Sequence, residues 1–139
     1  MPDDNAILVD IDSHVAVLTM NNAPANTWTA ESLIQLRKII EILNKDKNVY
    51  ALVITGQGEK FFSAGADLKL FANGDKAIAV EMAQCFGRAF ETLSAFRGVS
   101  IAAINGFAMG GGLEVALACD IRIAEAHVEM ALPEAKVGL

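Results

Sequence analysis

One stretch limits the possible folds of this chain more than any other, the apolar run over residues 99–119. It is long enough to cross a bilayer as a helix. However, it contains an Asn105-Gly106 pair, three consecutive glycines at 110–112 and the carboxylate of Glu114. A central glycine run and an ionisable side chain are both costly in lipid. We therefore expect a buried strand, a loop and a short buried helix here rather than a membrane span.

Length and composition exclude several classes of protein. With 139 residues the chain is expected to form a single domain over residues 1–139. Hydrophobic residues make up 53%, which excludes disorder, and a net charge of -6 gives no attraction to nucleic acid or anionic lipid. Two cysteines, Cys85 and Cys119, do not make a disulfide framework, so we expect buried thiols in a reducing compartment. The acidic start, Met1 to Asp4, resembles neither a secretory signal nor a transit peptide, which predicts a cytoplasmic protein.

Hydrophobic periodicity predicts strands and helices in alternation. Thr29 and Asp75 are suited to cap helices, because their side chains can accept hydrogen bonds from free helix amides. Helices are expected from Thr29 to about residue 44, from Asp75 toward Gly98, and for a few residues from Gly110. Strands are expected over residues 6–12, 14–20, 50–55, 99–104, 120–125 and 127–131, with a brief extended piece over 61–65. The alternation predicts an α/β fold with a mixed or parallel sheet covered by helices.

Several common functional motifs are absent from the sequence. A dinucleotide fingerprint that begins at Gly110 fails because Val115 stands where its third glycine is needed. No Gly-Lys pair provides a phosphate loop, and no serine lies in a G-x-S-x-G elbow. His14 and His127 are isolated from each other and from any cysteine at metal-ligand spacing, so we expect no metal site and surface positions for both histidines.

Two glycine-containing loops each follow an expected strand, Ser63–Lys69 and Asn105–Glu114. Small residues let a ligand approach the backbone closely, so that amide N–H groups become usable donors. Two such amides aimed at one point would stabilise an oxyanion, which can lower a reaction barrier by several kcal/mol. For each loop taken alone, a tight turn that needs positive φ is the simpler interpretation.

Two glutamates favour the catalytic interpretation. Glu114 lies three residues after Gly111, in an otherwise apolar helix, and we expect it to be buried, because an exposed or dipole-balancing role fits such surroundings less well. Glu134 follows Pro133 at a turn or helix start and is uninformative alone. A pair of glutamates beside an oxyanion site suits addition of water to an activated double bond, since one acid deprotonates the water and the other protonates carbon.

Three segments together resemble the crotonase superfamily, the enoyl-CoA hydratase/isomerase group. They cover residues 63–69, 105–120 and 132–139, and their order and spacing both agree with that family. The resemblance implies a crotonase-like ββα-repeat spiral, with a mixed or parallel sheet covered by helices.

The resemblance also implies roles for individual residues. The amides of Ala66 and Gly111 would form the oxyanion hole for a thioester carbonyl, and Glu114 and Glu134 match the two catalytic glutamates of hydratases. Binding of the CoA substrate would fall to Ala64, Ala66, Asp67, Leu68, Lys69 and Gly111, with Lys69 near the phosphates.

The implied reaction is that of a hydro-lyase in acyl-CoA or fatty-acid metabolism. It is the reversible hydration of a trans-2-enoyl-CoA to a 3-hydroxyacyl-CoA, without metal or redox cofactor, since coenzyme A is part of the substrate. An isomerase or another acyl-CoA enzyme of the same superfamily remains an alternative, as does an inactive or assembly fragment. Some relatives bind RNA, but that requires a basic face, which this acidic chain lacks.

The sequence departs from the family pattern at its C-terminal end. Family members continue beyond the Pro133-Glu134 segment into helices that complete the acyl pocket and bind neighbouring subunits, whereas this chain ends at Leu139. We therefore expect the N-terminal part of such an enzyme, with the C-terminal helical region absent and a trimer or hexamer as the assembly of the complete protein. The mean hydropathy of +0.38 is consistent with an apolar face that partners cover.

Overall fold

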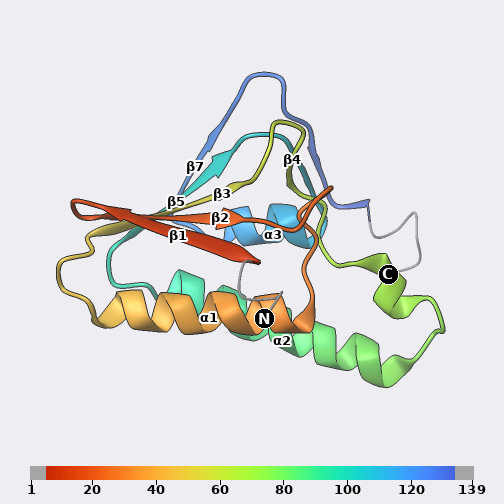
Figure 1. The fold of residues 1–139 in the computed structure, drawn as a ribbon. Coiled ribbons are helices and arrows are strands. Elements are labelled where there is room, and N and C mark those ends of the chain that lie inside the picture. Colours follow the sequence, from red (N-terminus) through yellow and green to blue (C-terminus); the bar gives the residue numbers. More distant parts are fainter. Residues whose placement is uncertain (1–5, 134–139) are drawn as a thin grey trace.

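The computed structural model describes residues 6–133, in which strands and helices alternate along most of the chain (Figure 1). In chain order the elements are β1 (Ile7–Asp12), β2 (Val15–Met20), α1 (Ala30–Lys45), β3 (Ala51–Gly56), β4 (Phe61–Ser63), the 3-10 helix η2 (Leu68–Phe71), α2 (Lys76–Ser94), β5 (Val99–Ile104), β6 (Phe107–Met109), α3 (Gly111–Leu117), β7 (Ile121–Ala124) and β8 (Met130–Ala131). The α/β class is confirmed.

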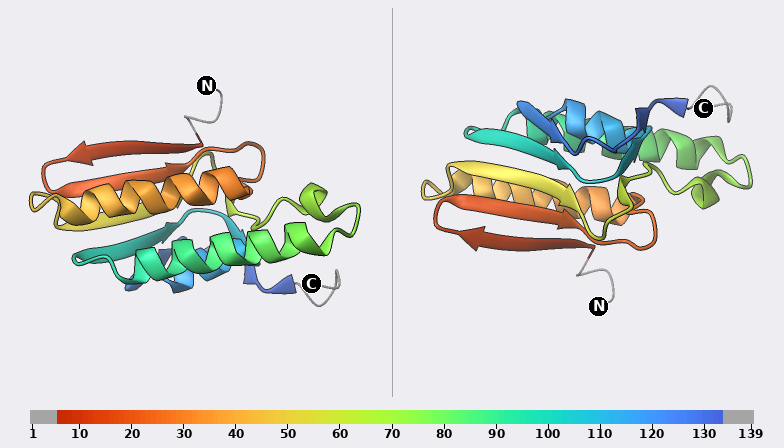
Figure 2. Two further views of the ribbon diagram at one scale, coloured as in Figure 1. Left: turned by 90° about the horizontal axis from the view of Figure 1, so that it is seen from below. Right: turned by 90° about the horizontal axis from the view of Figure 1, so that it is seen from above.

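A five-stranded mixed sheet forms the larger layer. Its strand order is β1-β2-β3-β5-β7, in which β1 is antiparallel to β2 and the remaining neighbours are parallel. Parallel neighbours need a crossover, and α1 and α2 provide two of these. Both helices lie side by side against the same face of the sheet (Figures 1 and 2).

The main core lies between this sheet and the helices. On α1 the residues Leu33, Leu36 and Ile40 recur at helical spacing and are buried, as their periodicity predicts. They face buried strand residues such as Leu18 and Leu52. Burial of each such side chain contributes about 1.5–3 kcal/mol to stability.

Both predicted helix caps are present. The Thr29 side chain accepts a hydrogen bond from the Ser32 amide, and the Ser32 side chain in turn accepts from the Thr29 amide, a reciprocal capping box. Asp75 caps α2, since its Oδ1 accepts from the Ala77 amide at 2.8 Å. Each helix therefore begins next to the residue that the sequence indicates.

A second sheet carries the loops that concern function, and the sequence prediction was wrong about part of it. The strands β4, β6 and β8 pair in parallel, although residues 107–109 were expected to be loop. The strand β6 has only three residues, which lie between two glycines, and three residues are too few to show an alternating pattern. The predicted strand over residues 127–131 is also shorter, Met130–Ala131, and η2 was not predicted.

A buried asparagine holds the start of this sheet in place. Asn26 has a φ of +51° and is 2% exposed. Its Nδ2 donates to the carbonyl oxygens of Gln57, Phe61 and Phe62 at 3.1–3.2 Å. These bonds satisfy carbonyl groups on both sides of the β3–β4 connection and thereby fix where β4 begins.

The apolar run over residues 99–119 folds into a strand, a turn and a short helix, as predicted, with one additional strand. It forms β5, the turn at Asn105-Gly106, β6 and α3. Within residues 6–133, no helix has both the length and the apolar character needed to cross a membrane. Cys85 and Cys119 are buried free thiols, which confirms the prediction for their side chains.

Candidate active site

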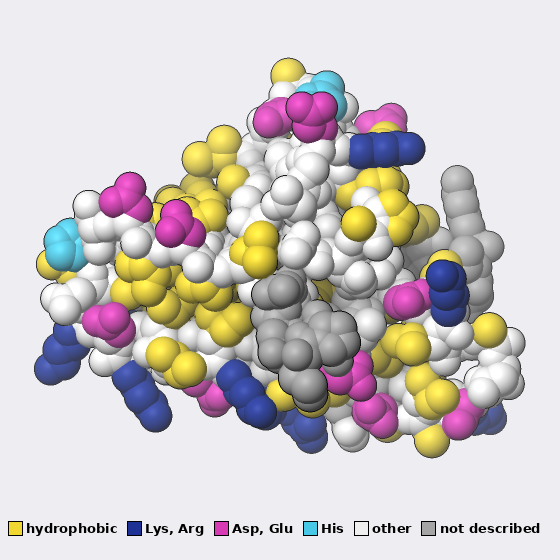
Figure 3. Space-filling model, viewed as in Figure 1, with side chains coloured by type: hydrophobic (Ala, Val, Ile, Leu, Met, Phe, Trp, Pro, Cys, Tyr) yellow, Lys and Arg dark blue, Asp and Glu magenta, His cyan; other side chains and the backbone are white. Residues whose placement is uncertain are grey.

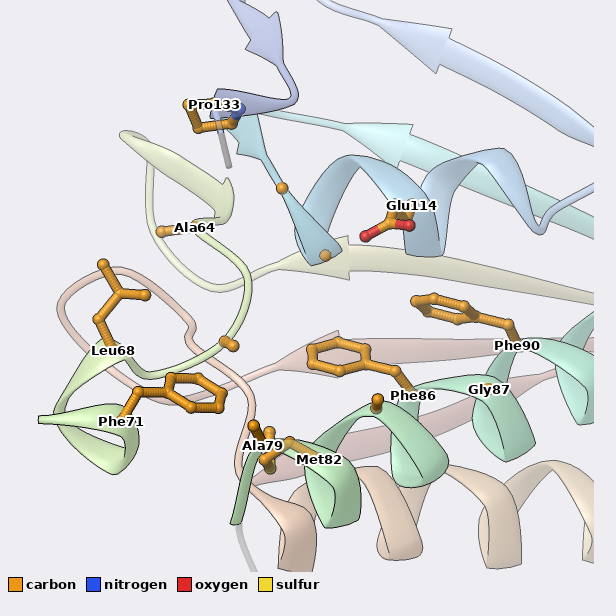
Figure 4. Close-up of a pocket in the computed structure, with 14 residues that line it drawn as sticks. Ala64, Leu68, Phe71, Ala79, Met82, Phe86, Gly87, Phe90, Glu114 and Pro133 are labelled. Carbon is orange, nitrogen blue, oxygen red and sulfur yellow. The ribbon is translucent and has the colours of Figure 1, made fainter. Parts of the chain in front are cut away.

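A cavity of about 630 Å³ lies between α2, the start of α3 and the loop after β4 (Figure 4). This volume is typical of sites that bind small molecules. Its walls come from the two glycine-containing loops on one side and from η2 and α2 on the other. The cavity therefore brings together segments that lie far apart in the sequence.

The two loops touch through their backbones at Gly65 and Gly111. A Cβ atom on Gly65 would lie 2.9 Å from the Gly111 nitrogen and 3.0 Å from the Met109 oxygen, so only glycine fits there. Gly65 also has a φ of +90°, which disfavours other residues. The parallel pairing of β4 with β6, for example Phe61 with Phe107, holds the loops next to each other.

Two backbone amides at this junction have no acceptor among the described residues. Trp28 and Ala66 form a parallel bridge in which the Trp28 amide donates to Gly65 and the Asp67 amide donates to Trp28, which leaves the Ala66 N–H unused. Gly111 is the first residue of α3, and its N–H likewise donates to no described residue. Both Ala66 and Gly111 line the cavity, so their free donors are available to a bound ligand.

Glu114 lies one turn into α3 and lines the cavity, but it is exposed, so the expectation that it is buried was wrong. Its apolar neighbours in sequence, Val115 and Ala116, are fully buried on another side of the helix. Figure 4 shows the Glu114 carboxylate between α3 and Phe90 of α2. Among the described residues that line the cavity, Glu114 is the one with an ionisable side chain.

The structure brings together some of the predicted site residues. Those that line the cavity are Ala64, Ala66, Leu68, Gly111 and Glu114. Asp67 and Lys69 do not line it: the Asp67 side chain caps η2 by accepting from the Lys69 amide at 3.1 Å, and Lys69 is exposed. Glu134 lies outside the described residues, and Pro133, which precedes it in the sequence, lines the cavity.

Sequence reasoning missed the wall that faces the loops. Phe86 and Phe90 of α2 border the cavity together with Phe71 of η2 (Figure 4). The rings of Phe86 and Phe90 are tilted against each other with centroids 5.5 Å apart. Their signal in the sequence was the recurrence of Ala79, Ala83, Phe86 and Phe90 every three or four residues, which marks a second apolar stripe beside the buried one.

The remaining candidates for chemistry lie elsewhere. His14 is exposed and stacks on Tyr50 with ring centroids 4.0 Å apart, and His127 lies 3.4 Å from Glu125 on the surface. In the described part of the chain, no three His, Cys, Asp or Glu side chains converge in a way that could hold a metal ion. Burial raises the pKa of the Cys119 thiol to about 12, which keeps it neutral.

Comparison with known proteins gives consistent matches over nearly the whole chain. A family model described as Enoyl-CoA hydratase/isomerase matches residues 10–139. A probable enoyl-CoA hydratase of Bacillus subtilis is 41% identical over an alignment that covers 97% of this chain and 52% of that protein. The chain spans about half the length of the curated relatives that it matches.

Solved structures share the fold. The structure of Pseudomonas aeruginosa DspI is 67% identical with a TM-score of 0.94, over 96% of this chain and 55% of that one. The enoyl-CoA hydratase from Bacillus anthracis is 34% identical with a TM-score of 0.92, over 96% of this chain and 53% of that one.

Proposed function

The chain belongs to the enoyl-CoA hydratase/isomerase family, the crotonase superfamily, and we propose that it carries the oxyanion site and the two acids of an enoyl-CoA hydratase. The proposed reaction is the reversible addition of water to a trans-2-enoyl-CoA. One observation carries this proposal: the free amides of Ala66 and Gly111 border the same cavity as the Glu114 carboxylate. Relatives that are named enoyl-CoA hydratase support the same assignment.

In this proposal the thioester carbonyl oxygen accepts hydrogen bonds from the Ala66 and Gly111 amides. Attack of water on C3 moves the π electrons of the double bond toward this oxygen, so negative charge develops where the two donors lie. Donors that are fixed in advance stabilise such a charge, and removal of one typically costs 10²- to 10³-fold in rate. The close packing of Gly65 on Gly111 supports this role, because it holds the two loops against each other.

The proton transfers are assigned to the two glutamates. One carboxylate removes a proton from the attacking water as its oxygen bonds to C3, and the other carboxylic acid delivers a proton to C2. Glu114 is suited to this work because it lines the same cavity as the two amides. Glu134 is the proposed second acid, and Pro133 beside it lines the same cavity.

A second candidate is an enoyl-CoA isomerase, because the family model that the chain matches covers both hydratases and isomerases. One acid suffices to remove a proton from one carbon of an enoyl thioester and return it to another. Deuterium incorporation from D2O into the substrate without net hydration would select this alternative.

An exposed apolar patch on β1 and α1 bears on the assembly of the protein. We propose a homo-oligomer in the cytoplasm, with no cofactor apart from the CoA moiety of the substrate. Val9 and Ile11 on β1 are 43% and 48% exposed, beside the similarly exposed Ile34 of α1. Figure 3 shows apolar side chains gathered on this face between β1 and α1, and such a patch favours contact with another protein surface.

The decisive experiment is an assay of the complete protein with crotonyl-CoA. Hydration is followed by loss of the absorbance of the conjugated enoyl thioester, and the product is identified by mass as a 3-hydroxyacyl-CoA. Saturable hydration supports the proposal. Binding of crotonyl-CoA with neither hydration nor proton exchange would overturn it.

A further inference from the structure

A glycine lies inside the helix that forms the far wall of the cavity. Gly87 belongs to α2 (Lys76–Ser94) and lines the cavity. Apart from proline, glycine is the least favourable residue in a helix interior. Its presence in a well-capped helix therefore calls for a physical reason.

Backbone conformation does not supply that reason. The glycines with positive φ are Gly58, Gly65, Gly74 and Gly110 in the described chain, and Gly87 is not among them. Any L-residue can adopt the helical conformation that Gly87 has.

Close packing does not supply it either. A Cβ atom on Gly111 would lie 2.8 Å from the Phe86 ring, whereas a Cβ atom on Gly87 would meet nothing within 4 Å. The space next to Gly87 is therefore open, and it borders the cavity. What the glycine provides is volume.

The open space next to Gly87 lies where the acyl group of the proposed substrate would extend. Figure 4 shows Gly87 on α2 between Phe86 and Phe90, at the end of the cavity where Glu114 lies, and Leu68 at the other end. With the thioester carbonyl at the Ala66 and Gly111 amides and the reacting carbons next to Glu114, the rest of the acyl group continues along α2 toward Gly87. Leu68 then borders the thioester side.

We propose that Gly87 sets the size of the acyl group that the cavity admits. This inference rests on the proposed function. The residues of α2 that line the cavity next to Gly87 are Ala83, Phe86 and Phe90, which are uncharged, so this part of the wall fits a hydrocarbon acyl group rather than a charged one. A larger side chain at this position would occupy the space that the end of the acyl group needs.

The test compares Gly87→Ala and Gly87→Leu with the unmodified complete protein across trans-2-enoyl-CoAs of increasing chain length. For Gly87→Leu we expect kcat/KM for crotonyl-CoA to stay within about twofold, while kcat/KM for longer chains falls at least tenfold, since small changes of shape in an apolar pocket change rates by about 10- to 200-fold. Gly87→Ala should raise the melting temperature and shift the length limit less.

Gln84→Leu is the matched control, because Gln84 is an exposed residue of the same helix that does not line the cavity. It should leave the chain-length profile unchanged. An unchanged profile in Gly87→Leu, or an equal loss for every substrate including crotonyl-CoA, would overturn the inference.

Failure of the proposed function is recognised separately. If the unmodified protein hydrates no enoyl-CoA, the reaction is wrong, and the size limit is then read from calorimetric binding of saturated acyl-CoAs of the same lengths. Weaker binding of long chains in Gly87→Leu but not in Gln84→Leu would still support the role of Gly87, and equal binding would overturn it.

Discussion

The carbonyl oxygen of Ser63 lies where a side chain on Gly112 would begin: a Cβ atom on Gly112 would be 2.1 Å from that oxygen. Together with the contact between Gly65 and Gly111, this places two chain segments backbone to backbone over several residues. The geometry of the site is thus fixed by main-chain packing. A side chain at Gly65 or Gly112 would push the two segments apart.

Gly65→Ala should therefore be strongly destabilising. We expect the free energy of unfolding to fall by about 3 kcal/mol, from positive-φ strain together with the clash against the Gly111 nitrogen. Gly58→Ala is the control, because Gly58 has the same φ of +90° but open space around it, and it should cost about 1 kcal/mol. Urea denaturation measures both, and equal losses would contradict the packing argument.

Glu114→Gln should separate chemistry from binding. The amide keeps the shape of the side chain but cannot exchange a proton, so hydration of crotonyl-CoA by the complete protein should fall about 10²- to 10⁴-fold. Affinity for a saturated acyl-CoA should change little. Glu125→Gln, on an exposed residue that does not line the cavity, should retain full activity. Undiminished turnover in Glu114→Gln would remove this residue from the reaction.

Asn26→Gly should weaken the second sheet. The glycine tolerates the φ of +51° but removes the donor to the carbonyl groups of Gln57, Phe61 and Phe62, so we expect a loss of about 2–4 kcal/mol in the free energy of unfolding. Ser13→Gly provides the comparison, since Ser13 has a φ of 57° but is exposed, and its effect should be below about 0.5 kcal/mol. Similar stability of both variants would show that the buried bonds contribute little.

The Cys119 thiol should make stability depend on alkaline pH. Burial raises its pKa from 9.0 to about 12, so the folded state favours the neutral thiol. The contribution of the neutral thiol to the free energy of unfolding is complete below pH 9. It is lost as the pH rises through about 12, because the thiol of the unfolded chain ionises at a lower pH than that of the folded chain. Thermal unfolding from pH 8 to pH 11 should show a fall in melting temperature that is smaller in Cys119→Ala. An equal fall in melting temperature with pH in both proteins would show that the Cys119 thiol does not contribute.

Local signals in the sequence were sufficient for much of the fold. Thr29 and Asp75 identified helix starts because a cap needs a specific side chain within a few residues. The short strand β6 could not be found this way, since its partner β4 is distant in sequence and three residues carry no period. Pairing across the chain, rather than local preference, makes residues 107–109 a strand.

The site was predictable to a similar degree. The resemblance to the crotonase superfamily implied that Ala66 and Gly111 act together, and both line the cavity. The exposure of Glu114 was not predictable from its apolar neighbours, because adjacent helix residues point in different directions. Phe86 and Phe90 could have been found from their spacing, but only the structure shows that their stripe faces the loops.

The pairing of β4 with β6 has a consequence for how such a chain can diverge. It holds Ala66 and Gly111 in place through the second sheet, whereas η2 and α2 form an excursion between the two strands. Substitutions between the two strands can therefore reshape the proposed acyl pocket without moving the proposed oxyanion donors. In this proposal, selectivity and chemistry occupy separate stretches of one polypeptide, so that one can be re-engineered while the other is left intact.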